Sequence, residues 1–251
     1  MSLQRSNTPD YSIVVPAFNE EDLLPATLRS LAEAMETVPY EGEVIVCDNN
    51  STDRTAEIAR TAGAHVVFEG TNQISRARNS GARAARGRWL IWIDADSRLP
   101  GDLLRAALDR LEAGRTAGGG SVIKMEGRSN AVLTAFVKLW TRISLRWGLA
   151  AGSFVFALRE AFDGVGGFSE QIYASEEIWF SRAVKRWGRK RGLGFEVLTD
   201  HPVVTSPRKA EWYSMATIVG VFVLFTVFPF LVRSKRFCFL WYRRPGRQRP
   251  S

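Results

Sequence analysis

Two carboxylates follow an apolar run in the stretch WLIWIDADSRLP, Trp89 to Pro100. Its first five residues are typical of a buried strand, and Asp94 and Asp96 stand where that strand ends. Carboxylates spaced two residues apart at a strand end can hold a hard divalent cation such as Mg2+ or Mn2+, which takes its other ligands from water or substrate. The structural alternative is that Asp94 only ends the strand and that Asp96 caps a helix starting near Pro100.

The elements that must position these carboxylates are strands alternating with helices. Strands are predicted in YSIVVPAFNE up to Pro16, in Val44 to Cys47, in HVVFEG and in the opening stretch. Helices follow each of them: one after Asn19, which can cap it, one from about Thr52, one in NQISRARNSGARAARG and one in GDLLRAALDRLEAG. This alternation predicts an α/β fold with a mostly parallel, Rossmann-like sheet and helices on both faces.

Ligands of such sheets bind beyond the carboxyl ends of the strands. Asp48 follows the second strand and Asp94 ends the fourth, so both should open onto one crevice. From Gly118 onward the pattern is irregular, with strands in GGGSVIKMEG and GSFVFALR and a helical stretch over residues 130–147. We expect this half to be the acceptor-facing part of the same domain.

Composition indicates a globular chain whose excess charge lies in its tail. The 251 residues are 45% hydrophobic and 24% charged, enough to bury one large core. The formal net charge is +8, and no acidic residue follows Glu211. Cys47 and Cys238 lie far apart, and MSLQRSNTPD lacks the apolar core of a signal peptide, so we expect a reducing cytoplasm.

Five motifs taken together resemble the family 2 glycosyltransferases with the GT-A fold. They are VVPAFNE, VCDNNSTDRT, RARNSGARAARGRWLIWIDADS, GGF and SEEIWFSRAVKRWG, in the order and spacing of that family from about Ser12 to Lys209. The resemblance implies an inverting, metal-dependent enzyme that uses a nucleotide-diphosphate sugar. It assigns residues 1–210 to the transferase domain and leaves 211–251 as a separate apolar and basic segment.

The resemblance also implies which residues bind the donor. The loop after the first strand and the Asp ending the second would hold the base and ribose, and the metal strand and a late basic residue would face the diphosphate. The implied donor residues are Pro16, Ala17, Asn19, Glu20, Asp48, Asp94, Ala95 and Arg208, with Asp94 and Asp96 as metal ligands. Helix capping is the structural alternative for Asn19, and it is favoured for Asp53.

Two further sets of side chains leave alternatives open. Arg76 and Arg78 sit where the family carries a basic residue, but two residues apart on a helix they cannot both point into the cleft, and Arg78 is favoured. Glu176 and Glu177 stand where the family keeps an acidic pair whose second member is the general base, which makes Glu177 the predicted base. The alternative is that both only decorate the first turn of a helix.

Late in the chain, TDHPVVTSPRKAEW offers His201, Arg208 and Lys209. An ordinary loop residue is the favoured interpretation of His201, whereas Arg208 could pair with a phosphate through two hydrogen bonds.

The segment from Met215 to Val232 is apolar over about 18 residues, just short of the roughly 20 that a spanning helix needs. Basic residues flank it on both sides, which favours a segment lying in the membrane interface over a single span. We expect the cytoplasmic face of the membrane, with burial of Phe222, Phe225, Phe228 and Leu231 in the acyl boundary and with anionic lipid, not nucleic acid, as partner. A C-terminal helix buried on the domain is the alternative.

Two other functions are also compatible with an Asp-x-Asp pair at a strand end. A magnesium-dependent phosphatase of the haloacid dehalogenase type also places Asp-x-Asp at a strand end, but on its first strand, whereas this pair is on the fourth. A non-catalytic membrane scaffold of the same fold is the second rival. The favoured prediction is transfer of a UDP- or GDP-linked sugar to a hydroxyl or lipid-phosphate acceptor, lipid-linked or glycan, in glycan or glycolipid synthesis.

Overall fold

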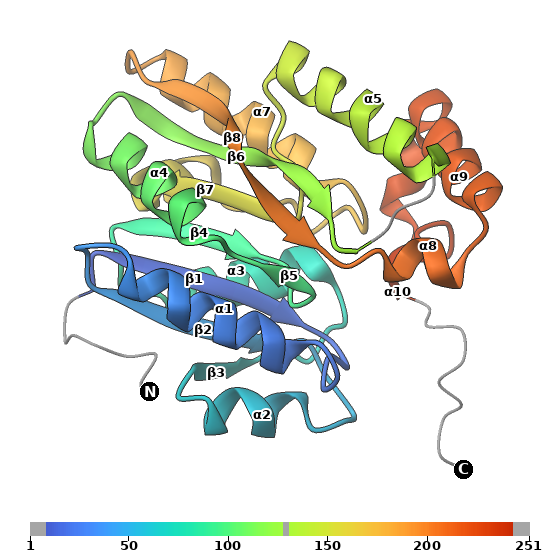
Figure 1. Ribbon diagram of the computed structural model, residues 1–251. Helices are drawn as coiled ribbons and strands as arrows, with labels where there is room; N and C mark the ends of the chain where they lie inside the picture. The colour runs from blue at the N-terminus through green and yellow to red at the C-terminus, as the bar shows by residue number, and fades with distance from the viewer. Residues whose placement is uncertain (1–8, 128–130, 243–251) are drawn as a thin grey trace.

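An eight-stranded mixed sheet forms the centre of the molecule (Figure 1). The computed structural model describes residues 9–127 and 131–242. The strands lie in the order β3-β2-β1-β4-β7-β6-β8-β5. Their bounds are β1 Tyr11–Ala17, β2 Gly42–Asp48, β3 His65–Phe68, β4 Trp89–Ile93, β5 Ser97–Arg98, β6 Thr116–Met125, β7 Phe154–Leu158 and β8 Gly194–Thr205.

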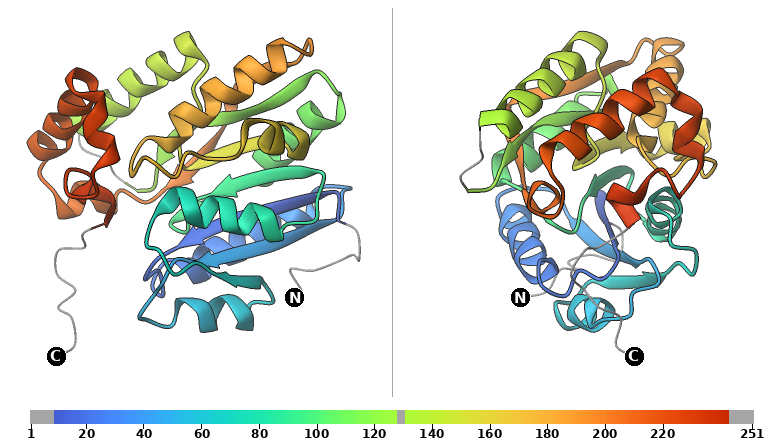
Figure 2. Two further views of the ribbon diagram at one scale, coloured as in Figure 1. Left: turned by 180° about the vertical axis from the view of Figure 1, so that it is seen from behind. Right: turned by 90° about the vertical axis from the view of Figure 1, so that its right-hand side faces the viewer.

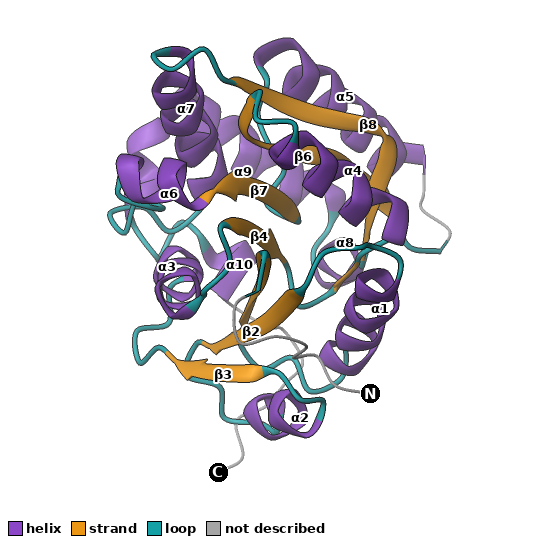
Figure 3. Ribbon diagram, turned by 90° about the vertical axis from the view of Figure 1, so that its left-hand side faces the viewer, coloured by secondary structure: helices purple, strands orange, loops and turns teal. Residues whose placement is uncertain are grey.

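Helices cover both faces of this sheet, as predicted. The bounds are α1 Leu24–Glu36, α2 Thr55–Thr61, α3 Ile74–Ala84, α4 Gly101–Glu112, α5 Ala131–Trp147, α6 Arg159–Val165 and α7 Glu176–Arg189. Alternate residues of β1 face opposite layers: Ile13 belongs to the core formed with α1 and α4, and Val14 to the core formed with α3, α6 and α7. Figure 3 shows these two helix layers on either side of the strands.

The parallel sheet predicted from the sequence is present in β3-β2-β1-β4, but the second half is mixed. Strand β7 runs antiparallel to β4, with Ile93 opposite Phe154, and antiparallel to β6. The chain returns to β4 from the opposite direction, so the amino end of β7 lies beside the carboxyl end of β4. Ser153 O consequently accepts a hydrogen bond of 3.5 Å from Asp94 N, which brings the turn before β7 to the edge where the carboxylates stand.

Helices α1 and α2 begin later than the sequence predicts, and the alternative of a cap for α4 is not realised. Helix α1 begins at Leu24, after Asn19, and Asn19 Oδ1 instead accepts from Thr52 N at 2.7 Å, so the predicted cap is wrong. Helix α2 begins at Thr55, not Thr52, because Asp53 Oδ1 accepts from Thr55 N at 3.0 Å and fixes the turn before it. Helix α4 begins after Pro100 without a side-chain cap, so Asp96 does not serve as its cap.

The C-terminal segment returns to the domain as short helices instead of one long one. They are α8 Arg208–Trp212, α9 Met215–Val227, η1 Pro229–Arg233 and α10 Phe239–Tyr242. In the described ranges, none of the helices has both the length and the apolarity that crossing a bilayer requires. Tyr173 N donates to Val232 O at 2.7 Å and Tyr242 Oη donates to Tyr173 O at 2.9 Å. These bonds fasten the segment to the loop that precedes α7.

One expectation about this segment is wrong. Phe225 was expected to enter the acyl boundary, but it is buried in a cluster with Ile172, Ala174 and Leu240, and its ring stacks on that of Trp241 at 6.1 Å. Leu231 packs against the same cluster, whereas Phe228 is exposed. One side of the segment is therefore buried against the domain, as the alternative of a packed helix predicted, and another side is exposed.

Candidate active site

The loop that carries Asp94 and Asp96 is held from three directions. Ser97 N donates to Asp94 O at 3.0 Å and closes the turn after β4. Thr27 Oγ1 of α1 donates to Ala95 O at 2.8 Å, and Ser206 N, just past β8, donates to Asp96 O at 3.1 Å. Both carboxylates are thereby fixed at the carboxyl end of β4, where parallel sheets place their ligands.

Arg208 joins this loop to the one after β1. Its Nη2 donates to Glu20 Oε1 at 2.6 Å and lies 2.9 Å from Asp96 Oδ2, and its guanidinium lies 5.3 Å from the ring centroid of Trp212. Burial acts to lower the pKa of Arg208, but the carboxylates of Asp96 and Glu20 outweigh it and raise that pKa above its ordinary value. The guanidinium therefore stays charged.

A cavity of about 90 Å³ lies around these groups, and we call it the β1 cavity. Seven predicted donor or metal residues line it: Pro16, Ala17, Glu20, Asp94, Ala95, Asp96 and Arg208. Asn49, Asn72, Ile74, Trp241 and Tyr242 also line it and were not predicted. Asn49 lies in a predicted turn and Asn72 at the start of a predicted helix, whereas the aromatic residues come from a segment that the sequence separated from the domain.

Asn19 and Asp48 do not line the β1 cavity. Asn19 has a φ of 52° and turns its side chain toward the loop before α2, as described above. Asp48 Oδ1 accepts from Ser51 N at 3.0 Å and closes the turn after β2, although no cap was expected of it. Their assignment to donor binding stays a prediction, and both have a structural use in this geometry.

Arg78 points into the interior and Arg76 does not. The Arg78 side chain is 1% exposed, and its Nη2 donates to Asp94 Oδ1 at 3.0 Å and to Gly152 O at 2.8 Å. Its Nη1 lies 2.8 Å from Glu176 Oε1. Arg76 instead pairs with Glu170 at 3.3 Å. Helix α3 thus directs one arginine between the carboxylate of β4 and the start of α7, which agrees with the preference for Arg78.

The first turn of α7 carries the acidic pair. Glu176 is buried, whereas Glu177 is half-buried and lines a second cavity together with Asp94 and Asp96. Ser175, immediately before the helix, has a φ of 61°, in the left-handed region that non-glycine residues seldom adopt. Adjacent residues of a helix point in directions about 100° apart, so the two carboxylates face different surroundings.

Those surroundings affect the acid–base behaviour of the pair. Burial, and next the neighbouring carboxylate of Glu176, raise the pKa of Glu177 from 4.5 to about 8. Burial also acts to lower the pKa of Arg78, but Glu176 and Asp94 outweigh it and raise that pKa. A carboxylate with a pKa near neutrality can accept a proton in a reaction and release it again, which is what a general base requires.

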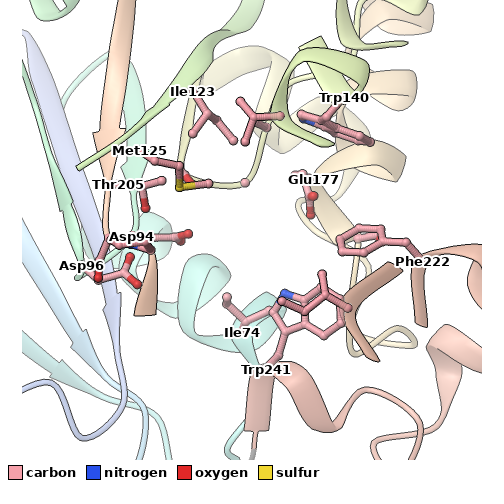
Figure 4. Close-up of a pocket in the computed structure, with 18 of the residues that line it drawn as sticks. Ile74, Asp94, Asp96, Ile123, Met125, Trp140, Glu177, Thr205, Phe222 and Trp241 are labelled. Atoms are coloured by element: carbon pink, nitrogen blue, oxygen red, sulfur yellow. The ribbon is translucent and has the colours of Figure 1, made fainter. Parts of the chain in front are cut away.

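The second cavity, of about 220 Å³, lies between α5, α9 and the carboxylates of Asp94, Asp96 and Glu177, and we call it the α5–α9 cavity. Asp94, Asp96, Ile74 and Trp241 line both cavities, so the two adjoin. In Figure 4, Asp94 and Asp96 lie on one side of this cavity and Glu177 lies opposite, with Trp140, Phe222 and Trp241 around them. The apolar wall was not predicted, because its members, such as Trp140 and Phe222, come from segments far apart in sequence.

The late candidate His201 lines neither cavity. His201 lies in β8, within the bulge between Leu198 and Val203, and not in the loop that was expected. The side chain of Lys209 lies outside the described part of the structure. Of the two late candidates whose side chains are described, Arg208 lies at the carboxylates and His201 does not.

The donor set at Asp94 and Asp96 suits a hard divalent cation. Both offer carboxylate oxygens to both cavities, and such cations prefer oxygen ligands. Within the described ranges, no group of three or more His, Cys, Asp or Glu side chains is placed to hold a metal ion. The two aspartates would thus supply part of a metal shell that a substrate completes.

Comparison with known proteins agrees with this geometry. The model of the family described as "Glycosyl transferase family 2" matches residues 12–162. An uncharacterised glycosyltransferase of Mycobacterium bovis is 39% identical over 102 residues, which cover 39% of this chain and 44% of that protein. The chain therefore spans less than half of the length of that relative.

Solved structures show the same fold. A mannosyltransferase from Pyrobaculum calidifontis, in complex with GDP-mannose and Mn2+, has a TM-score of 0.62 at 19% identity, covering 94% of this chain and 71% of that chain. The glucosyl-3-phosphoglycerate synthase of Mycobacterium tuberculosis, in complex with Mn2+, UDP-glucose and phosphoglyceric acid, has a TM-score of 0.61 at 20% identity, covering 90% and 79%. The family match decides against the phosphatase and scaffold alternatives, and the solved structures agree with it in fold.

Proposed function

Because this chain belongs to glycosyl transferase family 2 and is an enzyme of that family, we propose that it transfers a sugar from a nucleotide-diphosphate donor to an acceptor hydroxyl with inversion. The observation that carries the proposal is that Asp94, Asp96 and Glu177 line one cavity from opposite sides. UDP- and GDP-linked sugars are the proposed donors, since two neighbours of the same fold hold them.

The proposed transfer is a single displacement. The acceptor oxygen forms a bond to the anomeric carbon while the bond from that carbon to the diphosphate oxygen breaks, and the leaving nucleoside diphosphate keeps the electron pair. Glu177 takes the proton of the hydroxyl, because an alcohol becomes a competent nucleophile as it loses that proton. One displacement at the anomeric carbon inverts its configuration.

Side chains of the β1 cavity would hold the donor. Pro16, Ala17 and Glu20 face the place proposed for the nucleoside, and Arg208 has a planar guanidinium that can donate two hydrogen bonds to a phosphate. Asp94 and Asp96 would hold Mg2+ or Mn2+, which when bound supplies positive charge opposite the leaving diphosphate. Arg208, already charged and beside Asp96, would add to that stabilisation.

The proposed place of action is the inner face of the cell membrane. Exposed valines on α9 and arginines beyond it support an attachment to an anionic membrane surface. A lipid-linked or glycan acceptor is proposed, and nucleic acid is not. The division of the chain at residue 210 stays a prediction. Hydrogen bonds between Tyr173 and the C-terminal segment attach this segment to the domain.

Hydrolysis of nucleotide sugars by the purified chain tests the proposal. A panel of UDP- and GDP-linked sugars with Mn2+ or Mg2+ should reveal at least one donor whose hydrolysis is lost on chelation by EDTA. Asp96→Asn should remove the metal dependence of donor binding and leave the fold intact. Asp102→Asn, an exposed carboxylate at the start of α4, is the matched control and should behave like the unmodified protein. Donor binding by Asp96→Asn with unchanged metal dependence would contradict the assignment.

A further inference from the structure

The exposed apolar surface of this chain is concentrated around the α5–α9 cavity. Of the twelve large hydrophobic side chains exposed in the described part of the chain, ten lie on α5 or between Val219 and Phe237. They are Val132, Leu139, Leu145, Trp147, Val219, Val223, Val227, Phe228, Phe230 and Phe237. Isolated exposed apolar residues are ordinary, but a concentration of this size marks an interaction surface.

Helix α9 is apolar on all its sides. Ile218, Val221 and Phe225 are buried against the domain. Val219, Val223 and Val227 follow one another at intervals of four, so they share another face of the helix, and they are 38%, 57% and 61% exposed. A surface helix in water normally turns polar residues outward, whereas a helix that is hydrophobic all round lies in an apolar environment.

The charges around this surface identify the environment. Exposed cations of α5 are Lys138, Arg142 and Arg146, and Arg233 and Arg236 follow α9. No acidic residue occurs in α5 or after Glu211. Because a second copy of the chain would bring like charges together, an anionic bilayer suits this combination of apolar and basic side chains better than self-association.

The cavity between these helices joins an apolar wall to a polar floor. Leu133, Val137 and Trp140 of α5 and Ile218 and Phe222 of α9 form the wall, with Trp241 beside them. Both helices lie at the same end of the molecule and approach each other in Figures 1 and 2. A chain leaving the floor of the cavity would therefore pass between two helices that both expose apolar side chains.

The floor is anionic. Asp94, Asp96, Glu176 and Glu177 line it, and among the described lining residues Arg78 is the single cation. The Arg78 guanidinium is already shared between Asp94 and Glu176. The metal ion and Arg208 are proposed to face the donor diphosphate, so a phosphate head of the acceptor would meet the carboxylates of Glu176 and Glu177. As an anion it would also not need a base. An uncharged hydroxyl suits the floor and the proposed base equally well.

We propose that α5 and residues 215–242 dock on an anionic bilayer, and that the α5–α9 cavity admits an acceptor with an apolar chain and a neutral hydroxyl head. This inference rests on the proposed function, because it names the acceptor of the same site. It keeps the hydroxyl acceptor of the proposed function and adds that this acceptor carries an apolar chain.

The docking surface is tested with the full chain and vesicles. Co-sedimentation is measured with phosphatidylcholine alone and with phosphatidylcholine mixed with phosphatidylglycerol. The unmodified protein should prefer the anionic mixture, and Leu139→Glu and Val223→Glu should each weaken attachment about tenfold. Phe68→Glu is the matched control, since Phe68 is 66% exposed on the distant β3. Equal binding by all four proteins, or an equal loss in the control, overturns the docking surface, as does a lipid-free dimer that Val223→Glu dissociates.

The acceptor class is tested by calorimetric binding of three probes below their micelle-forming concentrations. Monododecyl glycerol has a chain and neutral hydroxyls, dodecyl phosphate has the same chain and an anionic head, and glycerol has no chain. The neutral lipid should bind about tenfold more tightly than the phosphate, Trp140→Ala should weaken it, and glycerol should not bind. Tighter Trp140-dependent binding of dodecyl phosphate, or no Trp140-dependent binding at all, overturns the inference.

Donor hydrolysis, measured on the same preparation, distinguishes a failure of this inference from a failure of the proposed function. Hydrolysis without binding of the lipid probe contradicts this inference and leaves the transferase intact. Binding of the probe without hydrolysis of any donor contradicts the proposed function itself.

Discussion

Arg208 Nη2 lies 2.9 Å from Asp96 Oδ2, so the aspartate predicted to hold a metal ion is paired with a guanidinium in the protein alone. The same guanidinium is bonded to Glu20. A cation entering at Asp96 must therefore compete with a charge that the chain itself supplies, and a donor diphosphate offers that guanidinium an alternative partner.

The first prediction concerns this competition. Arg208→Gln should raise the affinity of the donor-free protein for Mn2+ about tenfold, because it removes the positive charge beside Asp96, and should weaken binding of UDP or GDP. Electron paramagnetic resonance of free Mn2+ measures the first effect and calorimetry the second. Arg98→Gln is the control, since Arg98 pairs with Glu126 at the surface. Unchanged Mn2+ affinity in Arg208→Gln would show that the pair does not limit metal access.

The second prediction concerns the base. Glu177→Gln should lower turnover about a hundredfold or more with donor affinity little changed, because a positioned base contributes in this range. Glu176→Gln should lower turnover less and reduce stability instead, since Glu176 is buried beside Arg78. Steady-state kinetics and thermal unfolding of both variants give the comparison. Reversed kinetic effects would assign the base to Glu176.

The third prediction is a pH dependence. With the pKa of Glu177 raised to about 8, the ionised base becomes scarcer as pH falls, so kcat/KM should drop about tenfold per pH unit below that value. Glu177→Gln should lack this acidic limb. A limb centred near pH 4.5 would mean that Glu177 keeps its ordinary pKa in the active enzyme.

The same shift gives a prediction for stability. The folded protein holds this proton more tightly than the unfolded chain, so the contribution of Glu177 is complete below about pH 4.5 and is lost as pH rises through about 8. The free energy of unfolding of the unmodified protein should therefore fall between these values relative to that of Glu177→Gln. Urea titrations at several pH values measure the difference, and parallel pH profiles of the two proteins would contradict it.

The fifth prediction compares two arginines of α3. Arg78→Met should lower the free energy of unfolding by about 3 to 5 kcal/mol, because it leaves Asp94 and Glu176 without their buried partner. Arg76→Met should cost less than about 1 kcal/mol, since Arg76 is 41% exposed in its pair with Glu170. Denaturant unfolding of the two variants tests this, and similar losses would remove the distinction between them.

Local patterns were sufficient for the first half of the fold. The apolar runs of β1, β2 and β4 and the turns between them follow from residues close in sequence, so Asp94 and Asp96 were placed at the right edge. Strand β8 was missed because its bulge carries Asp200, His201 and Pro202, which do not resemble a strand. Asn19 was expected to cap α1, but a partner in another loop determined its conformation.

The site could be predicted only where its residues share an element or a motif. Helical geometry established that Arg76 and Arg78 diverge, but the choice between them depends on Asp94 and Glu176, which are 16 and roughly a hundred positions away. Trp241 and Tyr242 enter the site through bonds between the C-terminal segment and the loop before α7. Sequence periodicity reports local structure and could not predict this contact between distant segments.

The positive charge of Arg78 is shared between the metal-side carboxylate Asp94 and the start of α7. Its guanidinium is divided between Asp94, at the end of β4, and Glu176, beside the proposed base. Any binding event that withdraws the Asp94 carboxylate from this arginine leaves more of its charge for α7 and so favours the ionised form of Glu177. Because such coupling is reciprocal, deprotonation on the acceptor side must in turn favour occupancy on the donor side. Donor binding and ionisation of the proposed base are therefore expected to favour each other through one buried side chain.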